Sequence, residues 1–139
     1  MEYTDPDKYA TQRGRYLIRD LELGEKQAKA VGYCERGYSW SAIAKNLDTG
    51  TSTVKSYMER AMCLYGFEIA EQKVAVGEDQ PDYERVEPTY YRSRQLKDQK
   101  KWIKMVDRHQ NHVPVEFYND VRAAAKEDGL WSVIFDDIE

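Results

Sequence analysis

Cysteine is scarce in this chain: Cys34 and Cys63 are the two cysteines among 139 residues, and both lie in stretches of helical periodicity. Two cysteines are too few for a disulfide scaffold, so we expect reduced thiols in an intracellular, cytoplasmic protein. Long apolar runs are also missing, since none approaches the roughly 20 residues that a membrane span requires. The first residues include acids and lack the apolar centre of a secretory signal. The sequence therefore argues against a secreted domain and against a membrane partner.

The common sequence motifs of catalysis are missing too. There is no glycine-rich phosphate loop, no GxSxG, no HExxH and no suitably placed Cys–His pair. His109 and His112 are three residues apart, but no cysteine lies nearby and Pro114 follows, so a metal site is not expected. We expect no enzymatic activity, no metal and no cofactor.

Neither sign of charge is in large excess, because the net charge at pH 7 is −4. The sign nevertheless alternates along the chain. Residues 23–66 carry a net +2 and residues 92–104, with six basic residues and one acidic residue, carry +5. Residues 67–91 and 105–139 each carry −5. Such local asymmetry bears more on the choice of partner than the total charge does.

The apolar spacing predicts an all-α or mainly α fold, with one short strand allowed near the C-terminus. Residues 1–22 are expected to form a short helix or an arm that packs on a helical domain at 23–76. The acidic stretch 77–88 contains two prolines and is typical of a linker. A smaller module follows at 89–139. It contains the segment LWSVIFD, whose β-branched and aromatic residues favour a strand or a docking tail.

Residues 37–66 predict two short helices joined by a tight turn. Ser39 is placed to cap the first helix, and Asp-Thr-Gly at 48–50 supplies the turn. The second helix is expected over about 51–64, with an inner face formed by Val54, Met58, Ala61 and Tyr65. Its outer face is small, hydrogen-bonding or charged and consists of Thr51, Ser52, Lys55, Ser56, Glu59 and Arg60. These are the features that a helix-turn-helix requires.

A set of positions in the 44 residues from Leu23 to Gly66 forms a family pattern without a gap: Leu23, Gly37, Ser39, Ile43–Ala44, Leu47, Thr53-Val54-Lys55 and Gly66. On these residues the stretch resembles the DNA-binding domain of LuxR/GerE-type regulators and the related region 4 of sigma factors. The resemblance implies that the 51–64 helix enters the major groove of double-stranded DNA, while the helix at about 25–36 is scaffold. It implies that Lys55, Ser56 and Glu59 face base edges. Positions that would face bases or phosphates at the rim are Thr51, Ser52, Thr53 and Arg60.

The chain departs from the family pattern at three positions. Ala42 stands where the family usually has an acid that completes a capping box with Ser39. Gly50 stands where the family usually has a capping serine, so the cap is expected from Gly50 itself, Thr49 or Thr51. Tyr57 replaces a frequent histidine. The fourth helix of the family, its usual dimer contact, is not recognisable beyond Gly66, which leaves the mode of dimerisation open.

The basic segment in the C-terminal module has two interpretations, a second DNA contact or an interface helix with a solvated face. The DNA contact would use Arg92, Arg94, Lys97, Lys100, Lys101 and Lys104. An apolar stripe on the same segment predicts a homodimer interface through Leu96, Trp102, Ile103 and Val106.

Taken together, these features predict a sequence-specific, double-stranded DNA-binding transcriptional regulator of a prokaryote or a prokaryotic virus, acting as a homodimer. The alternative is a protein-interaction adaptor with a sigma-4-like fold that docks to the transcription machinery. The acidic stretches 67–91 and 105–139 motivate this alternative.

Overall fold

The computed structural model describes residues 5–75 and 77–135, and all regular secondary structure in these two ranges is helical. The prediction of an all-α fold is confirmed. The predicted short strand is wrong for the described part of LWSVIFD, because Leu130–Phe135 forms helix α8; Asp136 lies outside the described residues. A single strand would have no partner for its backbone groups in a helical unit, whereas a helix pairs them internally. The helix also brings Trp131 and Phe135 together, with ring centroids 4.3 Å apart.

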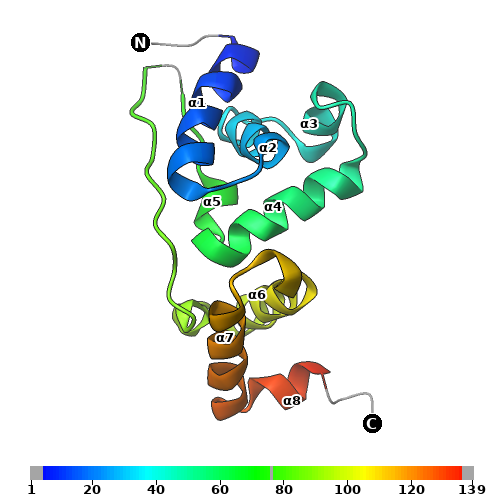
Figure 1. The fold of residues 1–139 in the computed structure, drawn as a ribbon, viewed down its shortest axis with the longest axis vertical. Helices are drawn as coiled ribbons and strands as arrows, with labels where there is room; N and C mark the ends of the chain where they lie inside the picture. The colour runs from blue at the N-terminus through cyan, green and yellow to red at the C-terminus, as the bar shows by residue number, and fades with distance from the viewer. Residues whose placement is uncertain (1–4, 76, 136–139) are drawn as a thin grey trace. The chain divides into compact units, whose positions relative to one another are not determined.

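The chain divides into an N-terminal unit, residues 1–84, and a C-terminal unit, residues 85–139. The N-terminal unit begins with α1 (Pro6–Leu21), which packs along α2 (Glu25–Glu35) (Figure 1). Asp5 caps α1 by accepting a hydrogen bond from the backbone N–H of Asp7 at 2.9 Å, and Pro6 occupies the first helical position. Residues 1–22 therefore contribute a long packed helix rather than an extended arm.

Helices α3 (Trp40–Asn46), α4 (Thr51–Tyr65) and α5 (Glu68–Glu71) complete the N-terminal unit. Both α2 and α3 pack on α4. The inner face expected for α4 is buried, since Val54, Met58 and Ala61 are fully enclosed and Tyr65 is 6 % exposed. The Tyr65 hydroxyl donates to the carbonyl of Leu21 at 2.9 Å, which ties the end of α4 to the end of α1.

The first part of the predicted linker is anchored to the N-terminal unit by a buried ion pair. The Glu35 carboxylate on α2 accepts from Arg13 Nε on α1 at 3.0 Å, and both side chains are almost completely buried. The hydroxyls of Tyr9 and Tyr83 donate to the same carboxylate at 2.7 and 2.5 Å. Arg13 also donates to the carbonyl of Pro81. The extended segment at 81–83 is thus part of the folded N-terminal unit rather than free linker.

The C-terminal unit contains η1 (Tyr90–Ser93), α6 (Leu96–Arg108), η2 (Gln110–His112), α7 (Val115–Glu127) and α8. Its core is built around Trp102 on α6, which is fully buried. The Trp102 ring packs against Tyr90, Tyr91 and Phe117, with ring centroids 5.4, 6.2 and 6.2 Å away. This aromatic cluster holds η1 and α7 against α6.

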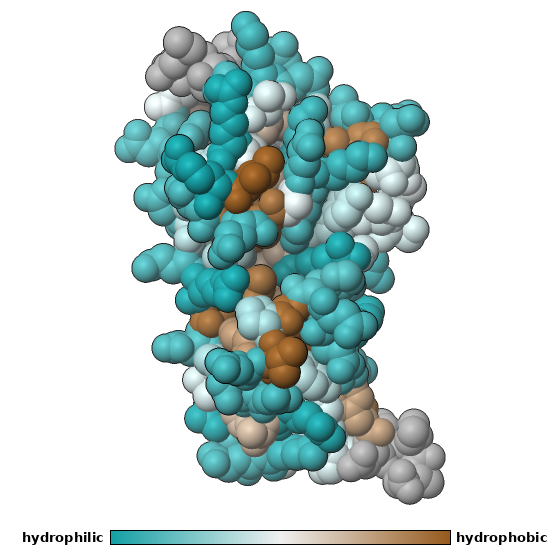
Figure 2. Space-filling model, in the orientation of Figure 1, coloured by the Kyte–Doolittle hydropathy of each residue, from teal (hydrophilic) through white to brown (hydrophobic). Residues whose placement is uncertain are grey.

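Figure 2 shows that hydrophilic side chains cover most of the visible face, with smaller apolar areas between them. Among the helices that the structure describes, none is both long enough and apolar enough to cross a membrane.

Candidate nucleic-acid interface

Helices α3 and α4 are joined by a four-residue turn, Leu47 to Gly50 (Figure 1). The Ser39 hydroxyl caps α3 by accepting from the backbone N–H of Ala42 at 3.2 Å, as the sequence predicts. At the other end, Asp48 adopts a left-handed conformation with φ 54°, which aspartate tolerates better than most residues. The N–H of Thr49 then donates back to the carbonyl of Ala44 at 2.9 Å. These local bonds end α3 and redirect the chain into α4.

The start of α4 is capped by backbone alone. Gly50 is the N-cap, one of the three residues expected for this role, and no side chain makes a capping hydrogen bond there. The carbonyl of Gly50 accepts from the N–H groups of Thr53 and Val54 at 3.1 and 3.2 Å. The first turn of α4 also lacks acidic residues. The N–H groups of Thr51 and Ser52 have no capping side chain among the described residues, and a helix start of this kind suits a phosphate oxygen; the exposed Asp48 lies in the turn before it.

The N-terminal half of α4 has two distinct faces. Val54 and Met58 are buried, whereas Thr51, Ser52 and Lys55 are exposed. Two further predicted DNA contacts, Thr53 and Ser56, are half-buried on the same half of the helix. The structure thus brings these five predicted residues together at one helix start, next to the turn.

Glu59 and Arg60 do not share this exposure. Glu59 is 6 % exposed, so the prediction that it lies on the exposed outer face is wrong, and Glu59 is not part of the exposed start of α4. Arg60 is half-buried, and its Nε is enclosed without a hydrogen-bond partner. The reason is that the second half of α4 is buried around its circumference, with Ala61, Met62, Cys63, Leu64 and Tyr65 all enclosed. The exposed polar residues of α4 are therefore confined to the N-terminal half of the helix.

Sequence reasoning missed the polar end of α3. Lys45 and Asn46 are exposed in its last turn, directly before the turn that leads into α4. The signal was present, because Ile43, Ala44 and Leu47 form the buried face and leave these two side chains directed outward. Lys45 adds a positive charge to the last turn of α3.

The two arginines of the basic C-terminal segment are held within the C-terminal unit. Arg92 makes a bidentate pair with Asp128 through Nε and Nη2, at 2.8 and 2.9 Å, and lies 3.5 Å from Glu127. Tyr91 donates to the same Asp128 carboxylate at 2.5 Å. These hydrogen bonds raise the pKa of Arg92 and lower that of Asp128. Arg94 is half-buried, with its guanidinium carbon 5.8 Å from the centre of the Tyr90 ring. Both arginines thus contribute to the fold of the C-terminal unit.

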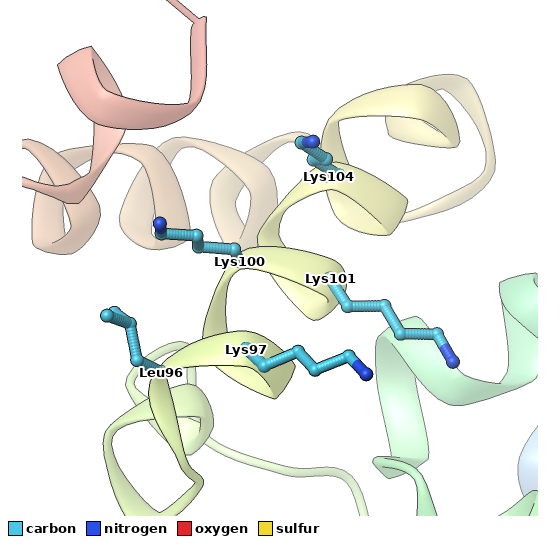
Figure 3. Close-up of a pocket in the computed structure, with 5 residues that line it drawn as sticks. All are labelled: Leu96, Lys97, Lys100, Lys101 and Lys104. Carbon is cyan, nitrogen blue, oxygen red and sulfur yellow. The ribbon is translucent and has the colours of Figure 1, made fainter.

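The four lysines of the segment are arranged differently, and we call Lys97, Lys100, Lys101 and Lys104 the lysine face. Together with Leu96 they line an open hollow of about 510 Å³ beside α6 (Figure 3). Figure 3 shows the four side chains extending from successive turns of the helix, Lys97 and Lys101 to the same side. This arrangement follows from their spacing of three and four residues, which places neighbours on adjoining parts of a helix surface.

The predicted dimer stripe is largely internal. Trp102, Ile103 and Val106 are fully buried within the chain, so the prediction that they form an exposed dimer interface is wrong. Leu96 alone among the four is exposed, at 55 %. An amphipathic stripe is the expected pattern both for a dimer contact and for a helix that covers its own core. Because Trp102 packs in an aromatic cluster within its own unit, the stripe covers the core of the C-terminal unit.

No group of three or more histidine, cysteine, aspartate or glutamate side chains within residues 5–75 and 77–135 is arranged to hold a metal ion. Cys34 and Cys63 are both buried. Burial raises the pKa of the Cys34 thiol, which favours its unreactive protonated form.

Comparison with models of protein families, with curated proteins and with solved structures gives no match for this chain.

Proposed function

We propose that the protein is a sequence-specific, double-stranded DNA-binding transcriptional regulator of a prokaryote or a prokaryotic virus, acting in the cytoplasm. Helices α3 and α4 form its helix-turn-helix, and the N-terminal half of α4 lies in the major groove. The observation that carries the proposal is the exposed start of α4 formed by Thr51, Ser52 and Lys55.

The chemistry of this surface supports the proposal. Lys55 is exposed on the second turn of α4, where an ammonium group can donate to guanine O6 or N7. The hydroxyls of Thr51 and Ser52 and the backbone N–H groups of the same turn are donors of the kind that fix a helix on phosphate oxygens. Val54 and Met58 anchor the opposite face in the core, so the polar face is held at a fixed orientation.

Selection of bound duplexes from a random pool tests the proposal, with the full chain as bait. We expect one enriched sequence motif, and a twofold repeat within it would support the predicted homodimer. Recovery of no motif, together with no binding of random duplex at low salt, would contradict DNA binding.

Lys55→Ala then tests the placement of the recognition helix. We expect this substitution to weaken binding to the selected site by ~1–3 kcal/mol and to relax the base preference at one position. Lys8→Ala is the matched control, because Lys8 is also an exposed lysine of the N-terminal unit but lies on α1. Equal affinities for the two variants would show that α4 is not the reading helix.

The adaptor function remains a second candidate because acidic side chains are exposed along the segment that follows α5. Glu78, Asp79, Asp82, Glu84 and Glu87 are all exposed. Such a segment suits a basic surface of the transcription machinery. Binding to RNA polymerase that is lost when these five acids are replaced by their amides, in the absence of any DNA binding, would favour the adaptor.

A further inference from the structure

We infer that the lysine face of α6 contacts the phosphate backbone of double-stranded DNA without reading its sequence, and thereby adds affinity to recognition by α4. This inference rests on the proposed function. It gives the C-terminal unit a role that is separate from base recognition.

The charge on α6 is concentrated and one-sided. The helix carries five basic residues and two acidic ones, and four of the basic residues form the lysine face. Trp102, Ile103, Met105 and Val106 fill the opposite side and are buried. The lysines are therefore held on the outside of a helix whose orientation within its unit is fixed by the core.

Within the part of the chain that the structure describes, Lys97, Lys100 and Lys104 make no ion pair. Arg92, by contrast, is neutralised by Asp128 and Glu127. In the C-terminal unit, Arg92 is therefore part of a bidentate ion pair that stabilises the fold. Lys97, Lys100 and Lys104 instead carry positive charges without an ion-pair partner among the described residues. A lysine ammonium acts as a compact point charge that attracts phosphate without imposing planar geometry.

The hollow beside α6 suits contact with a DNA phosphate backbone better than it suits binding of a small molecule. It is wide and open, and its lining consists of the exposed Leu96 and lysine side chains on one helix. No buried polar group converges on it among its lining residues, as a specific small ligand would require. Successive ammonium groups along an open surface instead match the regular negative charges of a duplex.

The covalent connection between the units makes a second contact effective even when it is weak by itself. The Tyr83 hydroxyl is hydrogen-bonded to Glu35 in the N-terminal unit, and Tyr90 begins η1 in the C-terminal unit. The seven Cα–Cα steps from Tyr83 to Tyr90 can span at most about 25 Å. A second contact on the same duplex would then be intramolecular, and short flexible linkers give effective concentrations of about millimolar when they can span the two sites.

The salt dependence of DNA binding tests the inference with two charge-matched double variants of the full chain. Lys97→Gln/Lys104→Gln removes two charges from the lysine face, and Lys8→Gln/Lys126→Gln removes two exposed lysines from α1 and α7. For the first variant we expect the slope of log K against log salt to become shallower by about 1.8, because each phosphate contact contributes about 0.9. The affinity ratio between the selected site and random duplex should stay unchanged, and the second variant should keep the wild-type slope.

Each alternative result has a distinct meaning. A wild-type slope in Lys97→Gln/Lys104→Gln, with site-selective binding intact, would overturn the lysine-face inference and leave the proposed function standing. A changed preference among sequences in that variant would overturn the claim that the contact is independent of sequence. If the wild-type chain binds neither the selected nor the random duplex, the proposed function itself fails, and the inference fails with it.

Discussion

Removing the charge of Glu35 is the sharpest test of how the N-terminal unit is held together. Its carboxylate is the acceptor for Arg13, Tyr9 and Tyr83, which come from α1 and from the segment after α5. Glu35→Gln keeps the shape of the side chain but removes the negative charge and places an amide N–H₂ against these donors. The Arg13 guanidinium, whose side chain is 2 % exposed, would then be a buried charge without a counter-charge.

The expected loss of stability follows from this burial. Breaking a buried ion pair by removing one partner costs about 3–5 kcal/mol, and a small domain has a total stability of about 5–15 kcal/mol. Glu35→Gln should therefore lower the free energy of unfolding of the N-terminal unit by about 3–5 kcal/mol. Replacing both partners, as Arg13→Met/Glu35→Gln, removes the stranded charge. This double variant should recover about 1–3 kcal/mol relative to Glu35→Gln, the coupling expected between residues in contact.

Urea unfolding followed by far-ultraviolet circular dichroism measures these differences, and hydrogen exchange of the α1 and α2 amides assigns them to the N-terminal unit. Glu84→Gln is the control, because Glu84 is an exposed glutamate of the same unit and should change stability by less than about 0.5 kcal/mol. A cost below about 1 kcal/mol for Glu35→Gln, or no recovery in the double variant, would refute the argument that a buried charge pair organises this unit.

Two further perturbations probe the same packing. Gly32→Ala should destabilise the N-terminal unit by about 1–3 kcal/mol, because a Cβ at Gly32 would lie 2.9 Å from the Ala10 Cα on α1. Gly14→Ala should instead be neutral or stabilising by up to about 1 kcal/mol, since its nearest neighbour would be 3.9 Å away; thermal unfolding of both variants checks this contrast. Burial and the hydrogen bonds to Glu35 raise the pKa of Tyr9 and Tyr83 above the ordinary value near 10. The stabilisation that the two protonated hydroxyls provide is therefore complete below about pH 10 and is lost as the pH rises towards the pKa values of the folded protein. Urea unfolding between about pH 8 and about pH 11 should show a steeper loss for wild type than for Tyr9→Phe/Tyr83→Phe, and parallel curves would contradict this assignment.

The helices around the candidate interface could be predicted because their signals are local. The spacing of Val54, Met58 and Ala61 defines one buried face of α4, and Ser39 caps α3 by a bond to a residue three positions away. Periodicity and capping depend on neighbours within a turn or two, which a sequence displays directly. The exposed start of α4 follows from the same local pattern.

Glu35 and Trp102 could not be assigned in this way because their roles depend on distant residues. The partners of Glu35 lie 22 to 48 residues away in the chain, and a lone glutamate in a helix has the same sequence pattern as a solvated one. Trp102 lies on an apolar stripe that would fit either a second copy or its own unit. The positions of Tyr90, Tyr91 and Phe117, which the sequence pattern does not give, decide the question.

The distribution of charge is compatible with the proposed DNA partner despite the net charge of −4. Exposed charges separated by more than about 8 Å are largely screened at physiological salt, so a phosphate responds to the side chains it approaches and not to the sum over the chain. The start of α4 presents Lys55 with no acid in the first turn of the helix, and Lys97, Lys100 and Lys104 of the lysine face make no ion pair within the described residues. The exposed acids at 78–87 lie on a different segment and would repel a duplex that approaches that segment. Under the proposed function, such a protein would bind random duplex weakly over most of its surface. The proposed contacts of α4 with base edges would then account for a larger share of the difference in affinity between its own site and other sequences.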